Sequence, residues 1–404
     1  MHIFHFMNIH LDIEQLKSGG RLINHGGGWM AALIGRMLRD TDFTFTCASF
    51  GKTRRMLTSH DERIVSIVIP ERGGLLACQE LVKKYDPDLI HIHGTEGAYG
   101  LLSARGLLEC PVVISLQGLL GPCSEWYHYF GDRSLMEIVR MHRWLEIPAM
   151  RGQWRGFIKI RKAAMREKEI ISGNRFFMGR TDWDRAYLQS QNPSANYFHE
   201  RRLLREAFMK KLWDINKIKR HRVIFTNAGH PRKGTEVVLD AIKVLKPIFP
   251  DIQICIAGSI SHKNGYGRYL HKCLARLEGS AMELGRLNAE EMIKEMLLSH
   301  VFVSPSFIDN SPNAVCEAQI IGMPVISSYT GGVPSLIENK RTGLFFPTGD
   351  APMLASRIRE VFENDSLAVI LGKQARIDAQ RRHEPSAVIN DIVKIYEDVL
   401  RLAS

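Results

Sequence analysis

The sequence predicts an α/β fold built from two Rossmann-like domains, each holding a parallel sheet between helices. The chain has 404 residues, and roughly 100–200 residues per domain suggests two or three domains. Short apolar, β-rich runs alternate with helical patterns, which is typical of βαβ units. This alternation stops at the polar, basic stretch 214–222 and then begins again. We therefore expect two domains that face each other across a cleft, with ligands beyond the carboxyl ends of the strands.

Each half of the chain supplies one set of elements. In the first half, apolar runs predict strands at residues 3–9, 43–49, 64–69, 89–93 and 112–116. Amphipathic stretches between them predict helices at residues 29–39 and 75–84. In the second half, strands are expected at residues 223–227, 252–257, 301–304, 325–327 and 344–346. The helices expected between and after these strands lie at residues 235–245, 290–299 and 313–321.

The last predicted helix covers residues 386–402. Ile389, Ile392, Tyr396 and Val399 recur at helical spacing and form one apolar stripe. We therefore expect this helix to pack back on the body of the protein. The predicted division is an N-terminal domain, a C-terminal domain and this crossover helix, at residues 1–215, 216–385 and 386–404.

The positive charge of the chain is concentrated in its middle. The formal net charge is +11, and residues 121–220 hold 21 Lys and Arg against 11 Asp and Glu. A basic excess indicates a polyanionic partner, which can be nucleic acid, an anionic membrane or a phosphorylated ligand. Composition alone does not choose among these three.

The cysteines and the hydropathy pattern exclude several classes of protein. The seven cysteines are dispersed without a CxxC pair, which argues against a disulfide framework and a zinc site. No apolar run approaches the ~20 residues that span a bilayer, and residues 1–12 do not resemble a secretory leader. We expect a cytoplasmic protein, with any membrane contact peripheral to the inner face of the cytoplasmic membrane.

Two segments of the first half can carry chemistry. The glycines Gly26, Gly27 and Gly28 precede a predicted helix, so the backbone can approach an anionic ligand there; the alternative is a flexible turn. His93 ends the strand 89–93, where residues of the cleft lie. A histidine at this position can be catalytic or can donate to a substrate hydroxyl, and the alternative is a structural histidine.

Two segments of the second half point to a phosphorylated ligand. Arg232 and Lys233 follow the first strand of this half and precede a helix, so they suit a pyrophosphate; the alternative is a solvated basic turn. Farther along, a strand ends at residue 304, a polar loop follows, and a helix begins near Asn313. Asp309 and Glu317 flank this helix start, where backbone amides offer an anion site and carboxylates can bind sugar hydroxyls.

In these motifs the sequence resembles the family 4 retaining glycosyltransferases of GT-B fold, of the bacterial surface-polysaccharide type. The family's Glu-x7-Glu motif corresponds to Asp309-x7-Glu317 here, and the downstream segments 322–326, 331–334 and 342–344 continue the family pattern. Lys233, the glycine loop at Gly27 and Gly28, and His93 follow the expected order. The resemblance covers nearly the whole chain.

The resemblance implies a nucleotide-diphosphate sugar as donor, a UDP- or GDP-sugar, and catalysis without a metal or other cofactor. Glu317 would hold the ribose, Asp309 the donor sugar, and Lys233 with Arg232 the departing pyrophosphate, while His93 would assist near the transferring sugar. The remaining donor contacts implied are Gly27, Gly28, Gly285, Arg286, Asn310, Ser311, Asn313, Ala314 and Val315.

The sequence departs from the family pattern at three positions. Asp309 is one methylene shorter than the usual Glu, and Ala228 stands where an Arg is usual before the Lys. Gln117 replaces a histidine that often follows the fifth strand, and its amide can still donate a hydrogen bond on the acceptor side. We expect Arg232 or another residue to replace the missing Arg.

The basic middle segment, residues 122–170, is expected to be a helical insertion in the N-terminal domain. It holds three of the six tryptophans among its cations, a combination typical of interfacial helices. We interpret it as a surface for an anionic membrane near a polyprenyl-diphosphate-linked acceptor. The alternative is a solvated helical insertion whose aromatic side chains pack in the core of the N-terminal domain.

Three functions compete. The first is transfer of a hexosyl or N-acetylhexosaminyl group, with retention, to a glycan acceptor in surface-polysaccharide synthesis. The second is a GT-B sugar-nucleotide epimerase, which would use the same donor but no acceptor. The third is a non-catalytic polyanion-binding protein. Nucleic acid is not an expected partner, because no recognisable nucleic-acid-binding module is present.

Overall fold

Apolar strands fix the cores of two units in the computed structural model of the chain. The structure describes residues 1–11, 28–52, 55–58, 62–141, 152–226, 228–277 and 279–404. The first unit comprises residues 1–121, 162–205 and 382–404, and the second comprises residues 122–161 and 206–381. Each unit is an α/β body with a parallel sheet, so the predicted pair of Rossmann-like domains is confirmed.

The sheet of the first unit has the strand order β3-β4-β2-β1-β5-β6-β7-β8. All its pairs are parallel except that of β3 with β4. The strands on one side of the sheet are β1 (His2–Phe6), β2 (Thr44–Gly51), β3 (Arg55–Thr58) and β4 (Ile64–Pro70). Those on the other side are β5 (Leu89–His93), β6 (Val112–Ser115), β7 (Phe176–Gly179) and β8 (Asn196–His199).

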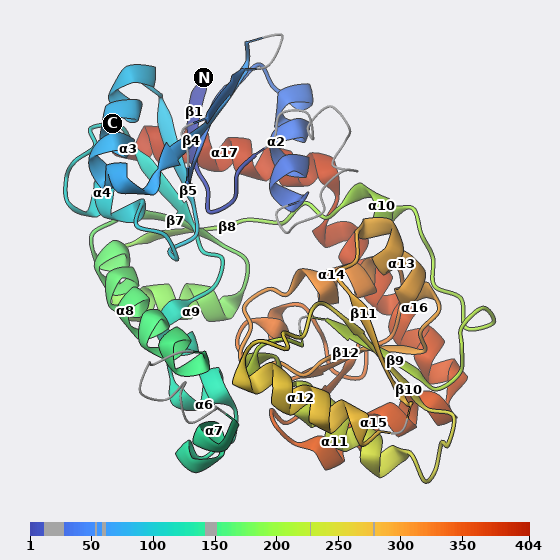
Figure 1. Cartoon of the computed structure of the whole chain (residues 1–404). Helices are drawn as coiled ribbons and strands as arrows, with labels where there is room; N and C mark the ends of the chain where they lie inside the picture. Colours follow the sequence, from blue (N-terminus) through green and yellow to red (C-terminus); the bar gives the residue numbers. More distant parts are fainter. Residues whose placement is uncertain (12–27, 53–54, 59–61, 142–151, 227, 278) are drawn as a thin grey trace. The chain divides into compact units, whose positions relative to one another are not determined.

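Helices cover both faces of this sheet. Among them are α2 (Gly28–Asp40), η1 (Glu71–Gly73), α3 (Gly74–Tyr85), α4 (Gly100–Ala104), α5 (Leu120–Cys123), α9 (Asp182–Gln191) and α17 (Pro385–Ala403). Helix α17 places its apolar stripe in one core cluster with α2 and the strands, and Figure 1 shows this C-terminal helix among the N-terminal elements. The expectation that the last helix packs back on the body is confirmed.

The sheet of the second unit has the order β11-β10-β9-β12-β13-β14 and is parallel throughout its named strands. The strands are β9 (Arg222–Thr226), β10 (Gln253–Ala257), β11 (Ala281–Gly285), β12 (Val301–Ser304), β13 (Val325–Ser328) and β14 (Leu344–Phe346). The helices that follow β9 to β12 include η2 (Pro231–Lys233), α11 (Thr235–Leu245), α12 (Gly265–Ala275), α13 (Ala289–Leu297) and α14 (Asn313–Ile320). The remainder include α10 (Glu206–Met209), η3 (Val333–Ser335), α15 (Ala351–Glu363) and α16 (Asp365–Arg382).

The insertion between β6 and β7 contributes to both units. Helices α6 (Trp126–Phe130) and α7 (Leu135–Met141) belong to the second unit, and α8 (Gln153–Ser172) passes from the second unit into the first. The sequence assigned residues 122–161 to the N-terminal domain, whereas their contacts group them with the second unit. The reason is the aromatic side chains of α6, which pack on residues that follow β9 and β12.

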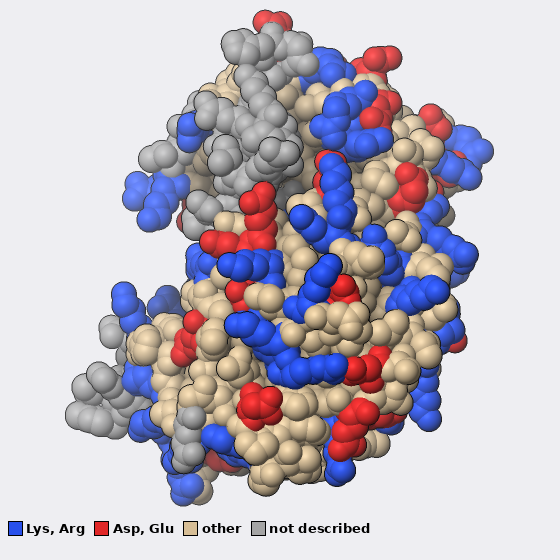
Figure 2. Space-filling model, turned by 90° about the vertical axis from the view of Figure 1, so that its right-hand side faces the viewer, with Lys and Arg blue, Asp and Glu red and all other residues tan. Residues whose placement is uncertain are grey.

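Basic side chains on α8 are exposed to solvent. They include Arg155, Lys159 and Lys162, which share one helix face at i, i+4 and i+7. On the face of the molecule drawn in Figure 2, Lys and Arg are interspersed with Asp and Glu. In the part of the chain that the structure describes, no helix is long and apolar enough to cross a bilayer.

Candidate functional site

The first candidate site lies where the strand order of the second sheet reverses. From β9 the chain proceeds to β10 on one side and later returns to β12 on the other. Ligands of parallel α/β sheets bind at such points, beyond the carboxyl ends of the strands. Lys233 follows β9 and Asp309 follows β12, and Lys233 Nζ lies 2.5 Å from Asp309 Oδ2. The structure therefore joins two residues that the sequence placed in one site.

Backbone geometry holds Asp309 in place. Its Oδ1 accepts the amide of Asn310 at 3.1 Å, and its carbonyl oxygen accepts the amide of Gly332 at 3.0 Å. Gly331 has φ +50°, and a Cβ there would lie 2.1 Å from the Asp309 carbonyl oxygen, so only glycine fits this turn. Burial pushes the pKa of Asp309 upward, but Lys233 and then Arg232 outweigh burial and leave the pKa below its usual value. Asp309 is thus a carboxylate at neutral pH.

The turn that carries Lys233 is equally constrained. His230 Nδ1 accepts the amide of Arg232 at 3.1 Å, which caps the short helix η2. Burial, followed by Arg232 and Lys233, lowers the pKa of His230 to about 3, so this imidazole is neutral. Gly234 ends the turn with φ +66°, and a Cβ there would lie 2.1 Å from the carbonyl oxygen of Pro305. Strand β12 therefore approaches this turn closely enough to exclude any side chain at position 234.

Helix α14 provides the second half of this site. The helix has no side-chain N-cap, so its first amides can serve an anion. Glu317 is buried one turn into the helix, Asn310 and Val315 are buried, and the residues between them are partly exposed. Those partly exposed positions include the predicted donor contacts Ser311, Asn313 and Ala314.

Two predicted residues lie farther from the reversal point. Gly285 ends β11, the edge strand two positions from β9, with φ +68°. Its carbonyl oxygen accepts the amide of Gly258 at 2.7 Å, which ties the ends of β10 and β11 together. Arg286 follows and is exposed. These two residues therefore stand at the carboxyl edge of the same sheet, separated from Lys233 by β10.

The first sheet reverses its order between β1 and β5, and histidines gather there. His93 Nε2 lies 2.9 Å from Nδ1 of His5, which the sequence analysis did not single out. His91 lies beside His93 with ring centres 3.8 Å apart, and its ring nitrogens lie 2.7 Å from Tyr396 Oη and from Ser115 Oγ. Burial, and then the neighbouring histidines, lowers the pKa of His93 well below 6.5. His93 is therefore a neutral hydrogen-bonding group.

Three histidines within ligand distance of one another bear on metal binding. The ligand atoms of His5, His91 and His93 all lie within 4.8 Å of one another, a donor type that suits zinc and other transition metals. Both nitrogens of His91, however, already face Tyr396 and Ser115, so only His5 and His93 have a ring nitrogen directed elsewhere. Because two neutral ligands form a poor metal site, this group fits a hydrogen-bonded cluster better than a metal centre.

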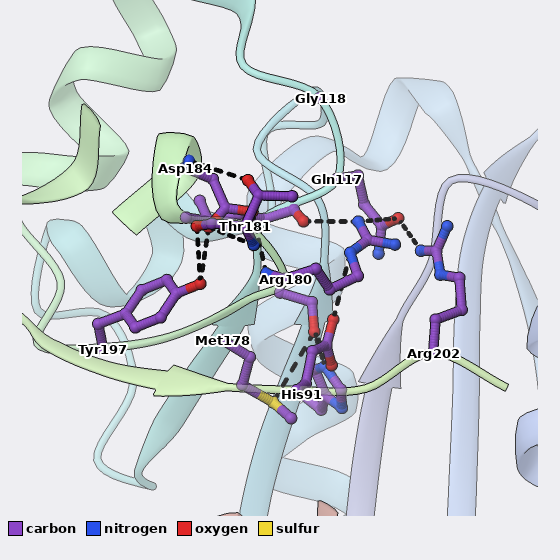
Figure 3. A network of polar contacts seen from close by, with 12 residues as sticks. His91, Gln117, Gly118, Met178, Arg180, Thr181, Asp184, Tyr197 and Arg202 are labelled. Carbon is purple, nitrogen blue, oxygen red and sulfur yellow. Dashed lines mark hydrogen bonds and ion pairs between the residues drawn. The ribbon is translucent and has the colours of Figure 1, made fainter. Parts of the chain in front are cut away.

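Gln117, the predicted acceptor-side residue, lies at the centre of a polar network at the same edge of the first sheet (Figure 3). Its Oε1 accepts a hydrogen bond from Arg180 Nη2 at 3.2 Å and another from Arg202 Nη2. The Arg202 guanidinium also stacks 4.1 Å from the ring centre of Trp29. The sequence analysis did not single out either arginine, since each follows a strand of only four residues.

An acidic residue among the basic residues of α8 binds the backbone of the loop that follows Gln117. Glu167 is buried and accepts the amides of Leu120 at 3.0 Å and Gly121 at 2.8 Å. Thr95 donates its hydroxyl to the same carboxylate at 2.5 Å. Burial raises the pKa of Glu167, and these donors partly offset it. Helix α8 therefore carries a structural carboxylate in addition to its exposed basic side chains.

The glycine loop is only partly described. Gly27 lies outside the described residues, and Gly28 is the first residue of α2. Trp29, the next residue, packs edge-on against His93 with ring centres 5.9 Å apart. The start of α2 is therefore adjacent to the His93 cluster.

The aromatic side chains of the insertion pack in the second unit. Tyr129, Phe130 and Phe157 form a buried cluster with Trp126 and Trp154 around it. Tyr129 also meets His230 at a ring distance of 4.8 Å, and Tyr127 meets Phe307 at 5.3 Å. These contacts connect the insertion to the loops that carry Lys233 and Asp309. Most aromatic side chains of the insertion are therefore packed, but in the second unit and not in the core of the N-terminal domain as the alternative expected.

Comparisons with known proteins agree with this fold. Residues 210–378 match the family described as "Glycosyl transferases group 1". Sucrose-phosphate synthase (tll1590) from Thermosynechococcus elongatus has a similar fold, with a TM-score of 0.75 at 16% identity over 100% of both chains. Anabaena Alr3699/HepE in complex with UDP-glucose gives 0.66 at 14% identity, over 100% of this chain and 99% of that one. The fold is thus that of GT-B glycosyltransferases.

Curated relatives that match over part of their length include two glycosyltransferases. The phosphatidyl-myo-inositol mannosyltransferase of Mycobacterium leprae (strain TN) is 28% identical over 170 residues, which is 42% of this chain and 44% of that protein. The amylovoran biosynthesis glycosyltransferase AmsK of Erwinia amylovora is 28% identical over 162 residues, 37% and 38% of the two chains. The chain spans less than half the length of either relative. Together with the family match, these similarities support a transferase.

Proposed function

We propose that this protein is a retaining glycosyltransferase of family 4 that acts in cell-surface polysaccharide synthesis. It would move a hexosyl or N-acetylhexosaminyl group from a UDP- or GDP-sugar to a glycan acceptor carried on a polyprenyl diphosphate. The observation that supports this most is the Lys233–Asp309 pair at the strand reversal, beside a helix start without a side-chain cap and the buried Glu317. A nucleotide-diphosphate sugar needs cations and amides for its phosphates and acceptor oxygens for its hydroxyls.

Each residue of the second unit has a role in this proposal. Lys233 and Arg232 stabilise the negative charge that develops on the diphosphate as the sugar–oxygen bond breaks. The amides at the start of α14 contact the sugar and phosphate, and Glu317 accepts from the ribose hydroxyls. Asp309 orients the donor sugar. Cations and helix amides then stabilise the negative charge of the departing diphosphate, as a divalent metal does in other enzymes with a phosphate leaving group.

The first unit would supply His93, Gln117 and the glycine loop. His93 is neutral, so it assists as a hydrogen-bond donor or acceptor at the transferring sugar and supplies no positive charge. Gln117 faces the acceptor, and Gly27 with Gly28 closes over donor and acceptor. The Anabaena structure in complex with UDP-glucose supports a nucleotide-sugar donor. The relative named for amylovoran biosynthesis supports a polysaccharide product.

Nucleotide-sugar binding tests the donor assignment. A thermal-shift panel of UDP- and GDP-sugars is expected to include one that stabilises the wild type, by roughly 2.7 kcal/mol at 100 times its dissociation constant. Glu317→Gln removes the carboxylate acceptor without changing the volume, so its response should largely disappear. Glu338→Gln, a control at an exposed carboxylate of the same unit, should respond like the wild type. Equal responses of all three proteins would refute the assignment.

Product analysis and oligonucleotide binding then distinguish the three competing functions. With the stabilising donor, product analysis should show sugar transfer to an added glycan acceptor and retention of the anomeric configuration. Release of a free epimerised sugar without transfer would indicate the epimerase. Salt-dependent oligonucleotide binding without any nucleotide-sugar response would indicate the polyanion-binding protein. Activity that survives exhaustive chelation would support the metal-independent mechanism.

The proposal also includes contact between the insertion and an anionic membrane. Leu135, Met136 and Val139 of α7 are exposed, and α8 presents exposed cations nearby in sequence; apolar groups with Lys and Arg suit an anionic interface. We expect anionic vesicles to retain the protein at low salt. Reversal of Arg155, Lys159 and Lys162 to Glu should abolish retention.

Charge reversal of Lys83 and Lys84, two exposed residues of α3, serves as the matched control and should leave retention intact. Equal retention of both reversed variants, or none by the wild type, would overturn the membrane contact.

A further inference from the structure

Residues that follow four neighbouring strands of the first sheet converge at its carboxyl edge. His93 ends β5, Gln117 follows β6, Arg180 follows β7 directly, and Arg202 follows β8. Since these strands are parallel and adjacent, their ends lie side by side, where ligands of such sheets bind. Figure 3 shows Gln117, Arg180 and Arg202 directed toward one another.

Arg180 is buried with much of its hydrogen-bonding capacity unused. The residue is 6% exposed, and its Nη2 donates to the carbonyl oxygen of Leu116 at 2.8 Å and to Gln117 Oε1 at 3.2 Å. Its Nε and Nη1 are buried without a hydrogen-bond partner among the described residues. The carboxylate of Glu200 lies 4.0 Å from Nε, beyond hydrogen-bond distance. A buried guanidinium with unsatisfied N–H groups is costly unless a ligand completes it.

Arg202 directs a second guanidinium at the same oxygen. It donates to Gln117 Oε1 and lies over the ring of Trp29. Two guanidinium groups thus share one neutral amide oxygen, whereas the partner that this geometry favours is an oxyanion, which accepts charge-assisted hydrogen bonds. Gln117 occupies the place that such a group would take.

Two acids lie near the arginines and set the local charge. Glu200 Oε1 lies 4.0 Å from Arg180 Nε, too far to accept its hydrogen bond, and Glu200 Oε2 accepts a hydrogen bond from the Ser115 hydroxyl at 3.2 Å. Glu96 accepts the amide of Gly118 at 3.1 Å. Burial raises the pKa of both carboxyl groups, and the two arginines oppose that rise. Each acid has its own donor, so neither replaces a ligand on Arg180.

We propose that Arg180 and Arg202 bind an oxyanion of the acceptor, a phosphate or a carboxylate group, at this edge of the first unit. The oxyanion takes the position of Gln117 Oε1, and Gln117 turns to donate its amide N–H. The proposal rests on the proposed transfer reaction and adds that the acceptor carries a negative charge near the reacting hydroxyl. An uncharged glycan would offer the guanidinium of Arg180 only neutral hydroxyl acceptors, without the charge-assisted hydrogen bonds of an oxyanion.

Direct anion binding tests this site. Inorganic phosphate and glucuronate, with glucose as the uncharged probe, are added to the full-length wild type in a thermal-shift experiment. At least one anion should raise the melting temperature, and Arg180→Gln and Arg202→Gln should each lose most of that rise. Arg175→Gln serves as the matched control, because Arg175 is exposed and precedes the same strand that Arg180 follows. It should respond like the wild type.

The anion that raises the melting temperature identifies the oxyanion of the acceptor. A rise with phosphate indicates a phosphorylated acceptor, and a rise with glucuronate alone indicates a carboxylated one. No response by the wild type to either anion, or an equal response by all variants, overturns the proposal. Arg180→Lys, which keeps the charge, provides a second variant if Arg180→Gln fails to fold.

Kinetics distinguish a failure of this site from a failure of the proposed function. In a transfer assay, Arg180→Gln should raise the KM for the charged acceptor about tenfold or more, with the donor-induced thermal shift unchanged. If no nucleotide sugar stabilises the wild type, the proposed function itself is wrong. If donors bind and transfer occurs but the acceptor KM of Arg180→Gln matches that of Arg175→Gln, only the anion site is wrong.

Discussion

At the scale of single residues, the structure places opposite charges where the second sheet reverses its strand order. Lys233 and Asp309 are 76 positions apart in the chain, yet they pair at 2.5 Å. A pyrophosphate would compete with Asp309 for the ammonium group of Lys233. In the proposed reaction, the pair would hold the cation in position for the leaving group before any ligand arrives, which would reduce reorganisation.

Substitution of Lys233 tests this role. Lys233→Gln should lower kcat by roughly 100- to 1000-fold, the range measured when one preorganised group that stabilises developing charge is removed. Lys243→Gln is the control, because Lys243 lies on α11 with an exposed ion pair to Asp240. A steady-state transfer assay of both variants measures the effect. A kcat of Lys233→Gln within a few-fold of the control would show that Lys233 does not act on the leaving group.

The positions of the candidate residues of the second unit follow more directly from the sequence than those of the first unit. Lys233, Asp309 and Glu317 flank strands and a helix whose apolar patterns are clear, so their place at a sheet edge follows from topology. His5 and Arg180 have no such signal. His5 lies inside a buried strand, and only the pairing of β1 with β5 brings it to His93. Arg180 follows β7, a strand that the sequence analysis did not predict, so its place at the sheet edge was not inferred.

At the scale of elements, the bounds of helices and strands were predicted best where the sequence has a clear apolar pattern. Strand β5, strand β12 and helix α11 have the predicted bounds, since each combines an apolar pattern with a clear start and stop. Strands β7 and β8 were not predicted: β7 lies between the charged residues Arg175 and Arg180, and β8 mixes polar with aromatic residues. Helix α9 is polar, and its start depends on a capping box between Thr181 and Asp184.

The contribution of α17 to the first unit can be measured. Ile392 is buried in the core cluster that α17 shares with α2 and the strands, so Ile392→Ala leaves a cavity where the helix meets the sheet. We expect a loss of about 2–5 kcal/mol in the free energy of unfolding, measured by chemical denaturation. Lys394→Ala, at an exposed position of the same helix, should change it by less than about 0.5 kcal/mol. Similar losses in both variants would contradict the packing of α17.

At the scale of the whole molecule, the chain passes between the two units more than once. Residues 122–161 leave the first unit for the second, and residues 382–404 return to the first. The sequence predicted the return of the last helix from its apolar stripe. It did not predict the assignment of residues 122–161, because the partners of the aromatic cluster lie far along the chain, at His230 and Phe307.

Buried neutral histidines in both units should make the protein sensitive to acid. Burial is the largest cause that lowers the pKa in each case, to about 3 for His5, His230 and His383, to about 4 for His300, and well below 6.5 for His91 and His93. An unfolded chain binds protons at these residues near the ordinary value of 6.5. Their contribution to stability is therefore complete above pH 6.5 and falls as the pH drops toward 3–4.

The expected result is a melting temperature that is nearly constant above pH 7 and falls steeply between pH 6.5 and 5. Each such histidine contributes a slope of roughly 1.4 kcal/mol per pH unit in this range. His300→Gln removes one of these groups and should make the decline shallower, whereas His199→Gln, at an exposed histidine, should leave it unchanged. A melting temperature that stays constant from pH 7 to 5 would show that these imidazoles are accessible to protons in the folded protein.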